Sequence, residues 1–239
     1  MDKRAEIEEQ RTYYNRRWSD FKYVEGPKLK RCVAILDALG RTVSAYPSTI
    51  ELGCGTGWLT NILGTFGSAV GVDLSDEAIA VARQRYQHIE FIAADLATWQ
   101  SYPREHFDLV VSHEVIEHLE DQTGHLEMAY GLLKPGGHLI LTTPQKRTCM
   151  AYPGILAYQA QPVEKWLNAS ELRPMLRSRF EIVELTTIIA GGGRTGIYRI
   201  LSSAWVRAGL KRIGLLSIFD HLVLRCGCGV HILAIARKT

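Results

Sequence analysis

The sequence predicts an α/β protein in which helices cover both faces of an open, doubly wound sheet of seven strands. Two observations predict this fold class. Seven short apolar runs are rich in Val, Ile and Leu without strict alternation, as in strands buried on both faces. Helix-like stretches separate most of these runs, which implies right-handed crossovers between parallel strands. Sheets of this kind bind ligands at the carboxyl ends of their strands, and we expect the functional residues there.

The strands are expected where apolar runs lie between turn residues. They cover residues 48–52, 69–73, 89–93, 107–112, 137–142, 180–189 and 229–236. Helices are expected at residues 57–65, 76–87 and 122–133. Ser75 is a suitable N-cap for the second of these helices, because Asp76 and Glu77 follow in its first turn. The sequence KPGG at residues 134–137 predicts the end of the third helix, followed by a tight turn.

The composition is that of a globular protein, with 239 residues of which 46% are hydrophobic and 22% charged. This balance argues against disorder, collagen and a coiled coil. The first residues are charged and no apolar run reaches the length of about 18 residues that a membrane span needs, so we expect a soluble protein without a signal peptide. The five cysteines lack the paired spacing of a zinc site, which favours reduced thiols in the cytoplasm.

A glycine-rich loop, ELGCGTG at residues 51–57, begins at the end of the first strand. Glycines at alternate positions permit positive φ and let a ligand approach the backbone closely. The loop alone leaves several interpretations open, including a tight turn without a ligand. A nicotinamide fingerprint would need glycine in place of Trp58, and a phosphate-binding P-loop would need GKS or GKT, which is absent.

Two aspartates follow at the ends of later strands. Asp73 ends the second strand, where a carboxylate can accept hydrogen bonds from two ribose hydroxyls. Asp95 closes the third strand, where it can accept a hydrogen bond from the exocyclic amine of adenine. Each acid alone would more often be a helix cap or a solvated charge. Together with the glycine loop they favour a ligand that contains adenosine.

These motifs resemble those of the class I S-adenosylmethionine-dependent methyltransferases, specifically the small-molecule type that includes the ubiquinone-biosynthesis O-methyltransferases. The sequences that match that family's motifs in order, over about residues 48–144, are ELGCGTG, GVDLS, AADL, FDLVVSHEVIEHL and LLKPGGHLILTTP. The resemblance implies a Rossmann-like methyltransferase fold with an antiparallel last strand, so that the sheet is mostly parallel. It also implies S-adenosyl-L-methionine as cofactor and S-adenosyl-L-homocysteine as product.

The resemblance also implies which residues hold the cofactor. The three glycines would surround its methionine part. Asp73 would hold its ribose, and Asp95 with Leu96 would hold its adenine. His113, directly after the fourth strand, would border both the cofactor and the reaction centre. The expected cofactor-binding residues are Tyr14, Glu51, Gly53, Cys54, Gly55, Gly57, Asp73, Leu74, Asp95, Leu96 and His113.

We expect one domain over residues 1–239, with four parts. These are a helical N-terminal lid at 1–35, the cofactor-binding core at 45–145, acceptor-side segments at 146–225 and the last strand at 229–236. By the same resemblance, Tyr13, Tyr14 and Trp18 would fold over the cofactor as part of the lid. Ordinary aromatic packing of a leading helix is the competing interpretation.

Methyl transfer from a sulfonium is an in-line displacement, so an enzyme must align the acceptor and remove its proton. The expected catalytic residues are His113, His118 and Glu117. Either histidine would be the base, and Glu117 would orient it. If the chain turns helical directly after the fourth strand, Glu114, Glu117 and His118 share one helix face. An imidazole flanked by carboxylates stays basic near neutral pH.

Two other interpretations of this cluster remain open. In the first, Glu117 and His118 bond the neighbouring backbone and shape the start of a helix. In the second, the E-x-x-E-H sequence at residues 114–118 binds a divalent metal, as similar motifs do in small-RNA 2′-O-methyltransferases and some ubiquinone-type enzymes. Residues 139–220 offer no later histidine to complete a set of four ligands, so we expect no metal site.

We expect a small-molecule acceptor, methylated on a hydroxyl or on an amine and either apolar or lipid-linked. Candidate lining residues of its pocket are Tyr152, Tyr158, Trp166 and Tyr198, although core packing explains each equally well. No nucleic acid partner is expected, because no RNA-binding module is visible. Two functions of other classes are retained. One is a nicotinamide-dependent oxidoreductase, which Trp58 argues against, and the other is a non-catalytic S-adenosylmethionine-binding protein.

The charge is uneven along the chain. Residues 191–239 contain eight Lys or Arg and one acidic residue. Residues 1–190 contain 20 Lys or Arg and 24 acidic residues. Apolar residues within 197–208 recur at the spacing of one helix face, which predicts a helix inserted before the last strand and packed on the sheet. The alternative is that residues 197–225 make peripheral contact with an anionic membrane, which would give access to a lipid-like acceptor.

Overall fold

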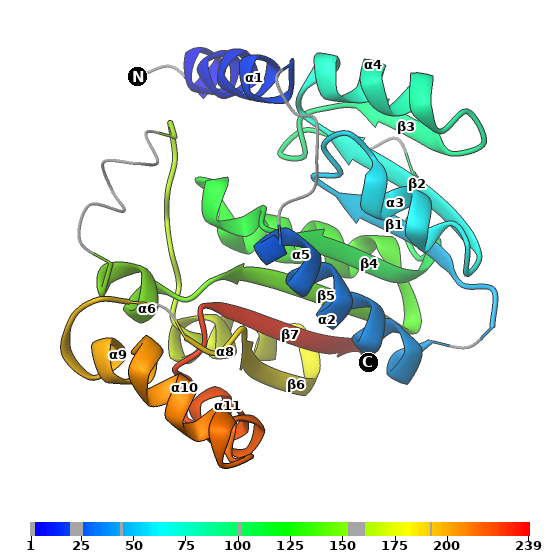
Figure 1. Cartoon of the computed structure of the whole chain (residues 1–239). Helices are drawn as coiled ribbons and strands as arrows, with labels where there is room; N and C mark the ends of the chain where they lie inside the picture. The colour runs from blue at the N-terminus through cyan, green and yellow to red at the C-terminus, as the bar shows by residue number, and fades with distance from the viewer. Residues whose placement is uncertain (1–2, 20–25, 44, 100–101, 153–160, 192) are drawn as a thin grey trace.

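The computed structural model describes residues 3–19, 26–43, 45–99, 102–152, 161–191 and 193–239. Its strands form one sheet in the order β3-β2-β1-β4-β5-β7-β6 (Figure 1). They are β1 (Ser48–Leu52), β2 (Ser68–Asp73), β3 (Glu90–Ala93), β4 (Phe107–His113), β5 (Leu133–Pro144), β6 (Phe180–Ile188) and β7 (His231–Lys238). β7 is antiparallel to both β5 and β6, and all other neighbouring strands are parallel. The predicted seven-stranded, mostly parallel sheet is confirmed.

Helices lie on both faces of this sheet (Figure 1). They are α1 (Lys3–Ser19), α2 (Gly26–Thr42), α3 (Trp58–Leu63), α4 (Asp76–Arg85), α5 (Gln122–Leu132), α6 (Lys146–Met150), α8 (Ala169–Arg177), α9 (Gly196–Leu201), α10 (Ala204–Arg212) and α11 (Leu216–Arg225), with a 3₁₀ turn η1 (Ile116–His118). Ser75 caps α4 as predicted, because its Oγ accepts a hydrogen bond from the N–H of Ala78 at 3.1 Å.

The two faces of the sheet carry separate hydrophobic cores. α2 and α3 pack on one face, whereas α5 and α8 pack on the other. β4 supplies both cores, with Leu109 and Val111 on the first face and Val110 on the second. Successive side chains of a strand point to opposite faces, so a strand covered on both sides is apolar without alternation. This is the sequence pattern that predicted the fold.

β5 begins earlier than the sequence predicts. The third predicted helix does end before the KPGG sequence, but residues 134–137 form a bulge inside β5 instead of a separate turn. Phe107 of β4 pairs with Leu133, and Leu109 pairs with His138, so the bulge adds residues to β5 alone. Gly136, within the bulge, has a φ of 78°. Glycine adopts this backbone conformation more easily than other residues do.

The insertion before β7 differs from its prediction. The expected single helix at 197–208 is two helices, α9 and α10, because the chain breaks at Ser202 and Ser203, and a third helix, α11, follows. α9 and α10 bury no residue and α11 buries only Val223, so the prediction of one helix packed into the sheet is wrong. No helix among the described residues combines the length and the apolarity needed to cross a bilayer.

Candidate active site

The carboxyl ends of β1, β2, β3 and β4 meet at one edge of the sheet. Leu52, at the end of β1, pairs with Val72 of β2 on one side and with Ser112 of β4 on the other. Asp73 is at the same level, paired with Ala93 of β3. From β1 the chain continues to β2 on one side and later to β4 on the other. Ligands of open α/β sheets bind at this kind of switch point.

The loop after β1 requires glycine at each alternate position. Gly53, Gly55 and Gly57 have φ values of 75°, 53° and 75°. A Cβ would lie 2.3 Å from Val115 at Gly53, 2.7 Å from the Trp18 ring at Gly55 and 2.5 Å from the Phe91 ring at Gly57. Both the backbone conformation and the available space exclude larger residues. The Cys54 side chain packs in a core cluster, so only the backbone of Cys54 faces the loop.

Replacing Gly57 by alanine is expected to destabilise the protein by about 1–3 kcal/mol, since alanine is strained at this φ and its methyl group would overlap Phe91. The measurement is urea unfolding. Gly40→Ala is a matched control, because Gly40 lies inside α2 with no atom within 4 Å of the new Cβ. Alanine there should be neutral or stabilising by up to about 1 kcal/mol. Equal stability of the two variants would contradict the close packing of the loop.

Asp73 joins this loop to the start of α4. Its carboxylate accepts hydrogen bonds from the N–H of Gly55 at 2.7 Å and from the N–H of Ser75 at 2.9 Å. The side chain is buried, and burial raises its pKa against the effect of these hydrogen bonds. Leu74 follows it directly and is half-buried. Asp73 is therefore held rigidly at the end of β2, where the sequence places the ribose.

Glu51 lies behind the loop, where its Oε2 accepts a hydrogen bond from the hydroxyl of Thr60 at 2.5 Å. Only 2% of the residue is exposed, and burial raises its pKa to about 8. Burial also lowers the pKa of Lys28, although the nearby Glu51 opposes this. Both shifts point to a site in which the cost of burying a charge exceeds the attraction between the two groups.

The buried Glu51 predicts a pH dependence of stability. A folded-state pKa of about 8, above the unfolded value, means that the folded protein holds this proton more tightly. The contribution to stability is complete below about pH 4.3 and is lost as the pH rises through 8. Urea unfolding of Glu51→Gln beside wild type should show wild type losing about 2–4 kcal/mol relative to the variant between pH 5 and pH 9. A stability difference that does not change with pH would contradict the buried, protonated Glu51.

Asp95 and Leu96 line a cavity of about 770 Å³ beside the end of β3. Its walls also include Trp99, His118 and Leu119, and α1 closes one side. The Asp95 carboxylate accepts a hydrogen bond from the N–H of Ala97 at 3.0 Å, so this acid also shapes the turn that follows β3. The volume falls within the range of ligand-binding clefts.

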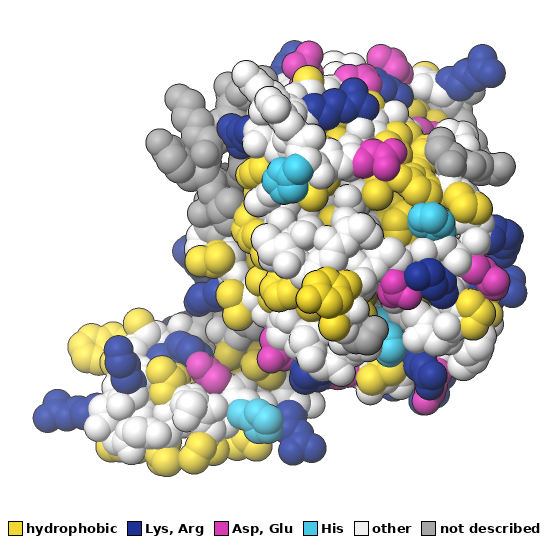
Figure 2. Space-filling model, turned by 90° about the vertical axis from the view of Figure 1, so that its right-hand side faces the viewer, with side chains coloured by type: hydrophobic (Ala, Val, Ile, Leu, Met, Phe, Trp, Pro, Cys, Tyr) yellow, Lys and Arg dark blue, Asp and Glu magenta, His cyan; other side chains and the backbone are white. Residues whose placement is uncertain are grey.

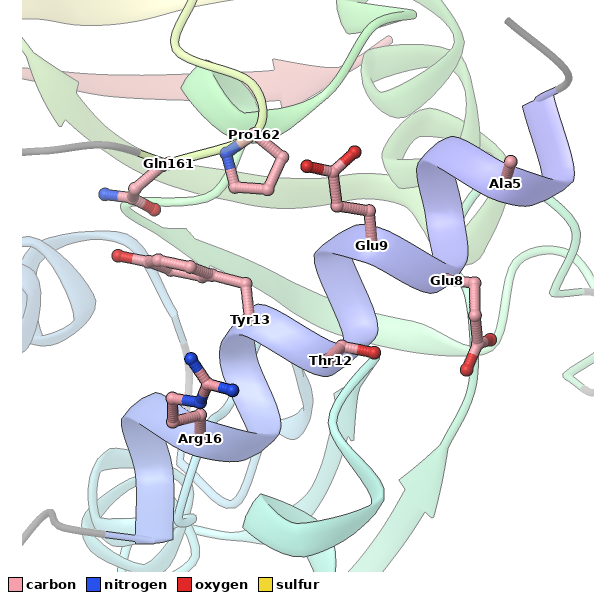
Figure 3. Close-up of a pocket in the computed structure, with 8 residues that line it drawn as sticks. All are labelled: Ala5, Glu8, Glu9, Thr12, Tyr13, Arg16, Gln161 and Pro162. Carbon is pink, nitrogen blue, oxygen red and sulfur yellow. The ribbon is translucent and has the colours of Figure 1, made fainter.

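Helix α1 lies across the carboxyl edge (Figure 1). The hydroxyl of Tyr14 donates a hydrogen bond to Oε1 of Gln161 at 3.0 Å, and burial raises the pKa of this half-buried phenol. The hydroxyl of Ser75 donates to Oδ1 of Asn15 at 2.6 Å. Figure 3 shows Tyr13 extending from α1 toward Gln161, across a surface hollow of about 710 Å³. α1 therefore covers the glycine loop and the region around Asp73.

His113, at the end of β4, is bonded to a second buried histidine through an arginine. Nε of Arg31 donates to Nε2 of His113 at 3.2 Å, and the other end of its guanidinium lies 3.1 Å from Nε2 of His231. Burial, opposed by Glu114 and aided by Arg31, lowers the pKa of His113 to about 3. His113 is therefore neutral, with its basic nitrogen already occupied by Arg31.

Glu114 pairs with residues outside its motif. Its φ is 58°, so the chain does not become helical directly after β4, and the condition for a common helix face of Glu114, Glu117 and His118 is not met. The Glu114 carboxylate lies 3.6 Å from Arg31 and 3.6 Å from Nδ1 of His231. Burial opposes its ionisation, but His231 and Arg31 together lower its pKa. Within the described part of the chain, no three His, Cys, Asp or Glu residues are grouped to hold a metal.

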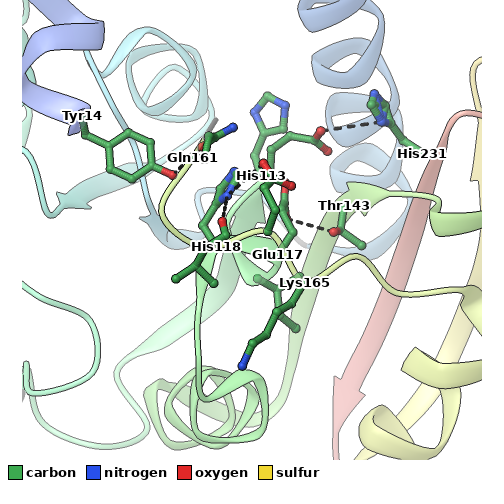
Figure 4. Close-up of polar contacts among 12 residues, drawn as sticks. Tyr14, His113, Glu117, His118, Thr143, Gln161, Lys165 and His231 are labelled. Carbon is green, nitrogen blue, oxygen red and sulfur yellow. Dashed lines mark hydrogen bonds and ion pairs between the residues drawn. The ribbon is translucent and has the colours of Figure 1, made fainter. Parts of the chain in front are cut away.

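His118 lies in η1 with carboxylates on two sides (Figure 4). Its Nδ1 is 3.1 Å from the carbonyl oxygen of Val163, and since a carbonyl only accepts, this nitrogen carries the proton. Glu117 accepts a hydrogen bond from the hydroxyl of Thr143 at 2.9 Å, and its other oxygen is 3.7 Å from Nε2 of His118. Burial lowers the pKa of His118 and raises the pKa of Glu117 well above its usual range. Nε2 of His118 is therefore a neutral nitrogen with a free lone pair.

Sequence reasoning missed Arg31, His231 and Glu164. Glu164 lies 3.5 Å from Nδ1 of His118, and burial raises its pKa to about 7. His231 begins β7 and pairs with Pro144 at the end of β5. The start of an antiparallel strand lies beside the carboxyl ends of its parallel neighbours, so the antiparallel last strand was a signal that could have found His231. Arg31 and Glu164 lie outside the motifs and had no such signal.

Known proteins resemble this chain in part. Residues 50–141 match the family model described as methyltransferase domain. The mitochondrial ubiquinone biosynthesis O-methyltransferase of Bos taurus is 30% identical over 192 residues, which cover 68% of this chain and 52% of the relative. A probable S-adenosylmethionine-dependent methyltransferase of Mycolicibacterium smegmatis is 30% identical over 150 residues, which cover 60% of this chain and 56% of the relative. The chain thus spans about half the length of these curated relatives.

Solved structures share the fold over almost the whole chain. N-methyltransferase NodS from Bradyrhizobium japonicum WM9, in complex with S-adenosyl-L-homocysteine, matches with a TM-score of 0.66 and 18% sequence identity. The match covers 96% of this chain and 98% of that structure. At this level of identity the similarity concerns the fold alone.

Proposed function

The chain belongs to the class I S-adenosylmethionine-dependent methyltransferases, and from this premise we propose that it transfers the methyl group of S-adenosylmethionine to an oxygen atom of a small acceptor. The observation that supports the proposal is the carboxyl edge of the sheet, where the glycine loop follows β1, Asp73 ends β2 and the segment after β4 carries His118. The loop needs glycine at these positions, because a Cβ at Gly53 would meet Val115 and a Cβ at Gly55 would meet the Trp18 ring. S-adenosylmethionine, when bound, supplies an electrophilic methyl group.

The proposed cofactor-binding roles follow from this geometry. The backbone of Gly53, Gly55 and Gly57 would contact the methionine part, as the sequence motif implies. Asp73 offers a fixed carboxylate to the ribose hydroxyls, and Asp95 with Leu96 lines the cavity that suits adenine. Tyr14 and the rest of α1 would exclude water from above. Glu51 and Cys54 support the loop from behind, since their side chains are buried there.

We propose His118 as the base, in preference to His113. A base needs a free lone pair, and Arg31 already occupies the basic nitrogen of His113. Nε2 of His118 has no such partner among the described residues except Glu117, at 3.7 Å. The carbonyl of Val163 fixes the tautomer, and Glu164 lies 3.5 Å from the same ring nitrogen. Glu117 orients the ring from the opposite side.

The acceptor class is proposed from the relatives and from the lining. The Bos taurus relative is named as an O-methyltransferase of ubiquinone biosynthesis, which favours an aromatic hydroxyl and an apolar or lipid-linked acceptor. Trp166 is buried and Tyr198 half-buried, whereas Tyr152 is 38% exposed and stacks on Arg194. Tyr158 lies outside the described residues. None of these three residues lines the cavity beside Asp95, so the apolar acceptor pocket stays a prediction.

The experiment is a methyl-transfer assay with labelled S-adenosylmethionine and a panel of acceptors. The panel contains catechols and hydroxybenzoates, each in a form that carries a prenyl tail and a form that lacks it. Each compound is compared to an amine of similar shape. We expect transfer to a hydroxyl acceptor and higher turnover for the prenylated compounds. Transfer to amines alone would contradict the oxygen acceptor.

Two controls separate this proposal from functions of other classes. Calorimetry should detect S-adenosylhomocysteine binding and no binding of reduced nicotinamide cofactors. Binding of S-adenosylhomocysteine without turnover of any acceptor would favour a non-catalytic binding protein.

We also propose a cytoplasmic location, on the sequence argument for reduced thiols.

A further inference from the structure

Exposed hydrophobic side chains gather on the three-helix lobe, which we define as residues 196–225 and which contains α9, α10 and α11. Of the fifteen large hydrophobic side chains that are exposed in the described part of the chain, eight belong to this lobe. They are Ile197, Ile200, Trp205, Val206, Ile213, Leu215, Ile218 and Leu222. Exposed apolar residues scattered singly need no explanation, but a cluster of this density marks an interaction site.

These side chains do not serve the core of the protein. The lobe projects from the body in Figure 2, with hydrophobic side chains along its lower edge and at its upper outer corner. It is attached through α11, where the hydroxyl of Thr187 donates to the carbonyl of Leu224 at 2.8 Å. Within the lobe, Arg207 makes a double hydrogen bond with Asp220, at 2.7 and 2.9 Å, which holds α10 against α11. A polar contact thus shapes the lobe and leaves its apolar side chains free.

The charge of the lobe has one sign. Asp220 is its only acidic residue, and Arg207 neutralises it. The lobe also contains Arg199, Lys211, Arg212 and Arg225. In the described regions no carboxylate lies within ion-pair distance of any of these four residues. Figure 2 shows the basic side chains between and beyond the hydrophobic ones.

We propose that the three-helix lobe binds the surface of an anionic lipid membrane. Such a surface offers negative headgroups and an apolar layer directly beneath them, which matches basic and apolar side chains that alternate over three short helices. Trp205 is 90% exposed, and an indole ring prefers the boundary between headgroups and acyl chains. A folded partner protein would have to place separate carboxylates between several hydrophobic contacts, whereas a fluid lipid surface adapts to them. The proposal does not depend on methyl transfer.

The test is co-sedimentation of the full-length protein with vesicles at low salt. Vesicles of phosphatidylcholine with phosphatidylglycerol should carry the protein into the pellet, and vesicles of phosphatidylcholine alone should not. Added salt should release the protein, since screening weakens the contribution of the basic residues. Trp205→Ser and the double variant Lys211→Glu/Arg212→Glu should each lower the partition coefficient roughly tenfold or more.

Matched controls replace equally exposed residues elsewhere. Tyr46→Ser removes an aromatic ring that is 87% exposed, and Arg85→Glu/Arg177→Glu reverses two basic charges on α4 and α8. Both control variants should sediment as wild type does, and thermal unfolding should be the same for all variants. Failure of wild type to sediment with anionic vesicles, or equal loss in the controls, would overturn the proposal. A lobe-dependent dimer in light scattering, without vesicle binding, would overturn it and assign the lobe to a second copy of this chain.

Discussion

Replacing His118 by glutamine is expected to lower kcat by about 10²–10⁴-fold while leaving the affinity for S-adenosylhomocysteine within about threefold of wild type. Glutamine keeps a donor for the carbonyl of Val163 but has no basic nitrogen at the position of Nε2. The acceptor would then lose its proton to water, which is the slower route. Steady-state rates with the acceptor identified in the panel measure the loss of kcat. Calorimetry of S-adenosylhomocysteine binding measures the affinity separately.

His113→Gln is the matched comparison. The glutamine carbonyl can still accept the hydrogen bond from Arg31, so the contact of α2 with β4 is retained and the rate should fall by less than about tenfold. The two variants therefore distinguish the two histidines that the sequence offers as the base. A large loss in His113→Gln with near-normal rates in His118→Gln would reverse the assignment.

The pH profile gives a second readout of the same role. A base must be unprotonated, and burial lowers the pKa of His118 from its ordinary value of about 6.5. The acid side of the kcat/KM profile should therefore have its midpoint below pH 6.5, and this limb should disappear in His118→Gln. Glu164→Gln should leave this midpoint nearly unchanged, because burial raises the pKa of Glu164 to about 7 and its carboxyl is mostly protonated over the pH range of this limb.

Asp73→Asn is expected to weaken the binding of S-adenosylhomocysteine by about 1–3 kcal/mol, which is roughly 5- to 150-fold in Kd. The amide offers one acceptor oxygen where the carboxylate has two, and the buried N–H groups of Gly55 and Ser75 already need both. The ribose hydroxyls would then compete with the backbone for a single acceptor. Calorimetry measures the loss of affinity.

The control for this variant is Asp37→Asn on the outer side of α2. Asp37 is exposed, and among the described residues Arg41 is its one ion-pair partner. Its replacement should therefore leave the affinity unchanged. Unfolding curves of both variants show whether the glycine loop is still held in place. Unchanged affinity in Asp73→Asn would mean that the ribose does not bind at the end of β2.

The sheet could be predicted from the sequence because its signals are local. Each strand buried on both faces is a short apolar run, and Ser75 marks the start of α4 by its own side chain. The glycine loop was equally accessible, since three positive φ values at alternate positions require three glycines. These features depend on neighbours in sequence, and the resemblance to a known family placed them in order.

The polar cluster could not be predicted in the same way, because it depends on distant contacts. Glu114 adopts a positive φ, and this one residue directs its side chain to Arg31 and His231 instead of to Glu117. Arg31 lies 82 residues before His113 along the chain, yet it decides that His113 is not a free base. The helix expected at 197–208 was predicted to pack on the sheet, but the chain forms two helices there, and a helical period does not reveal the break between them at two serines.

A crystal structure of the complex with S-adenosyl-L-homocysteine tests the central claim most directly. We expect the ribose hydroxyls within hydrogen-bonding distance of the Asp73 carboxylate, the adenine beside Asp95 and Leu96, and the sulfur in the space between the glycine loop and His118. Binding of the compound at another surface would contradict these positions. So would a structure at saturating concentration in which the glycine loop is unchanged and nothing is bound.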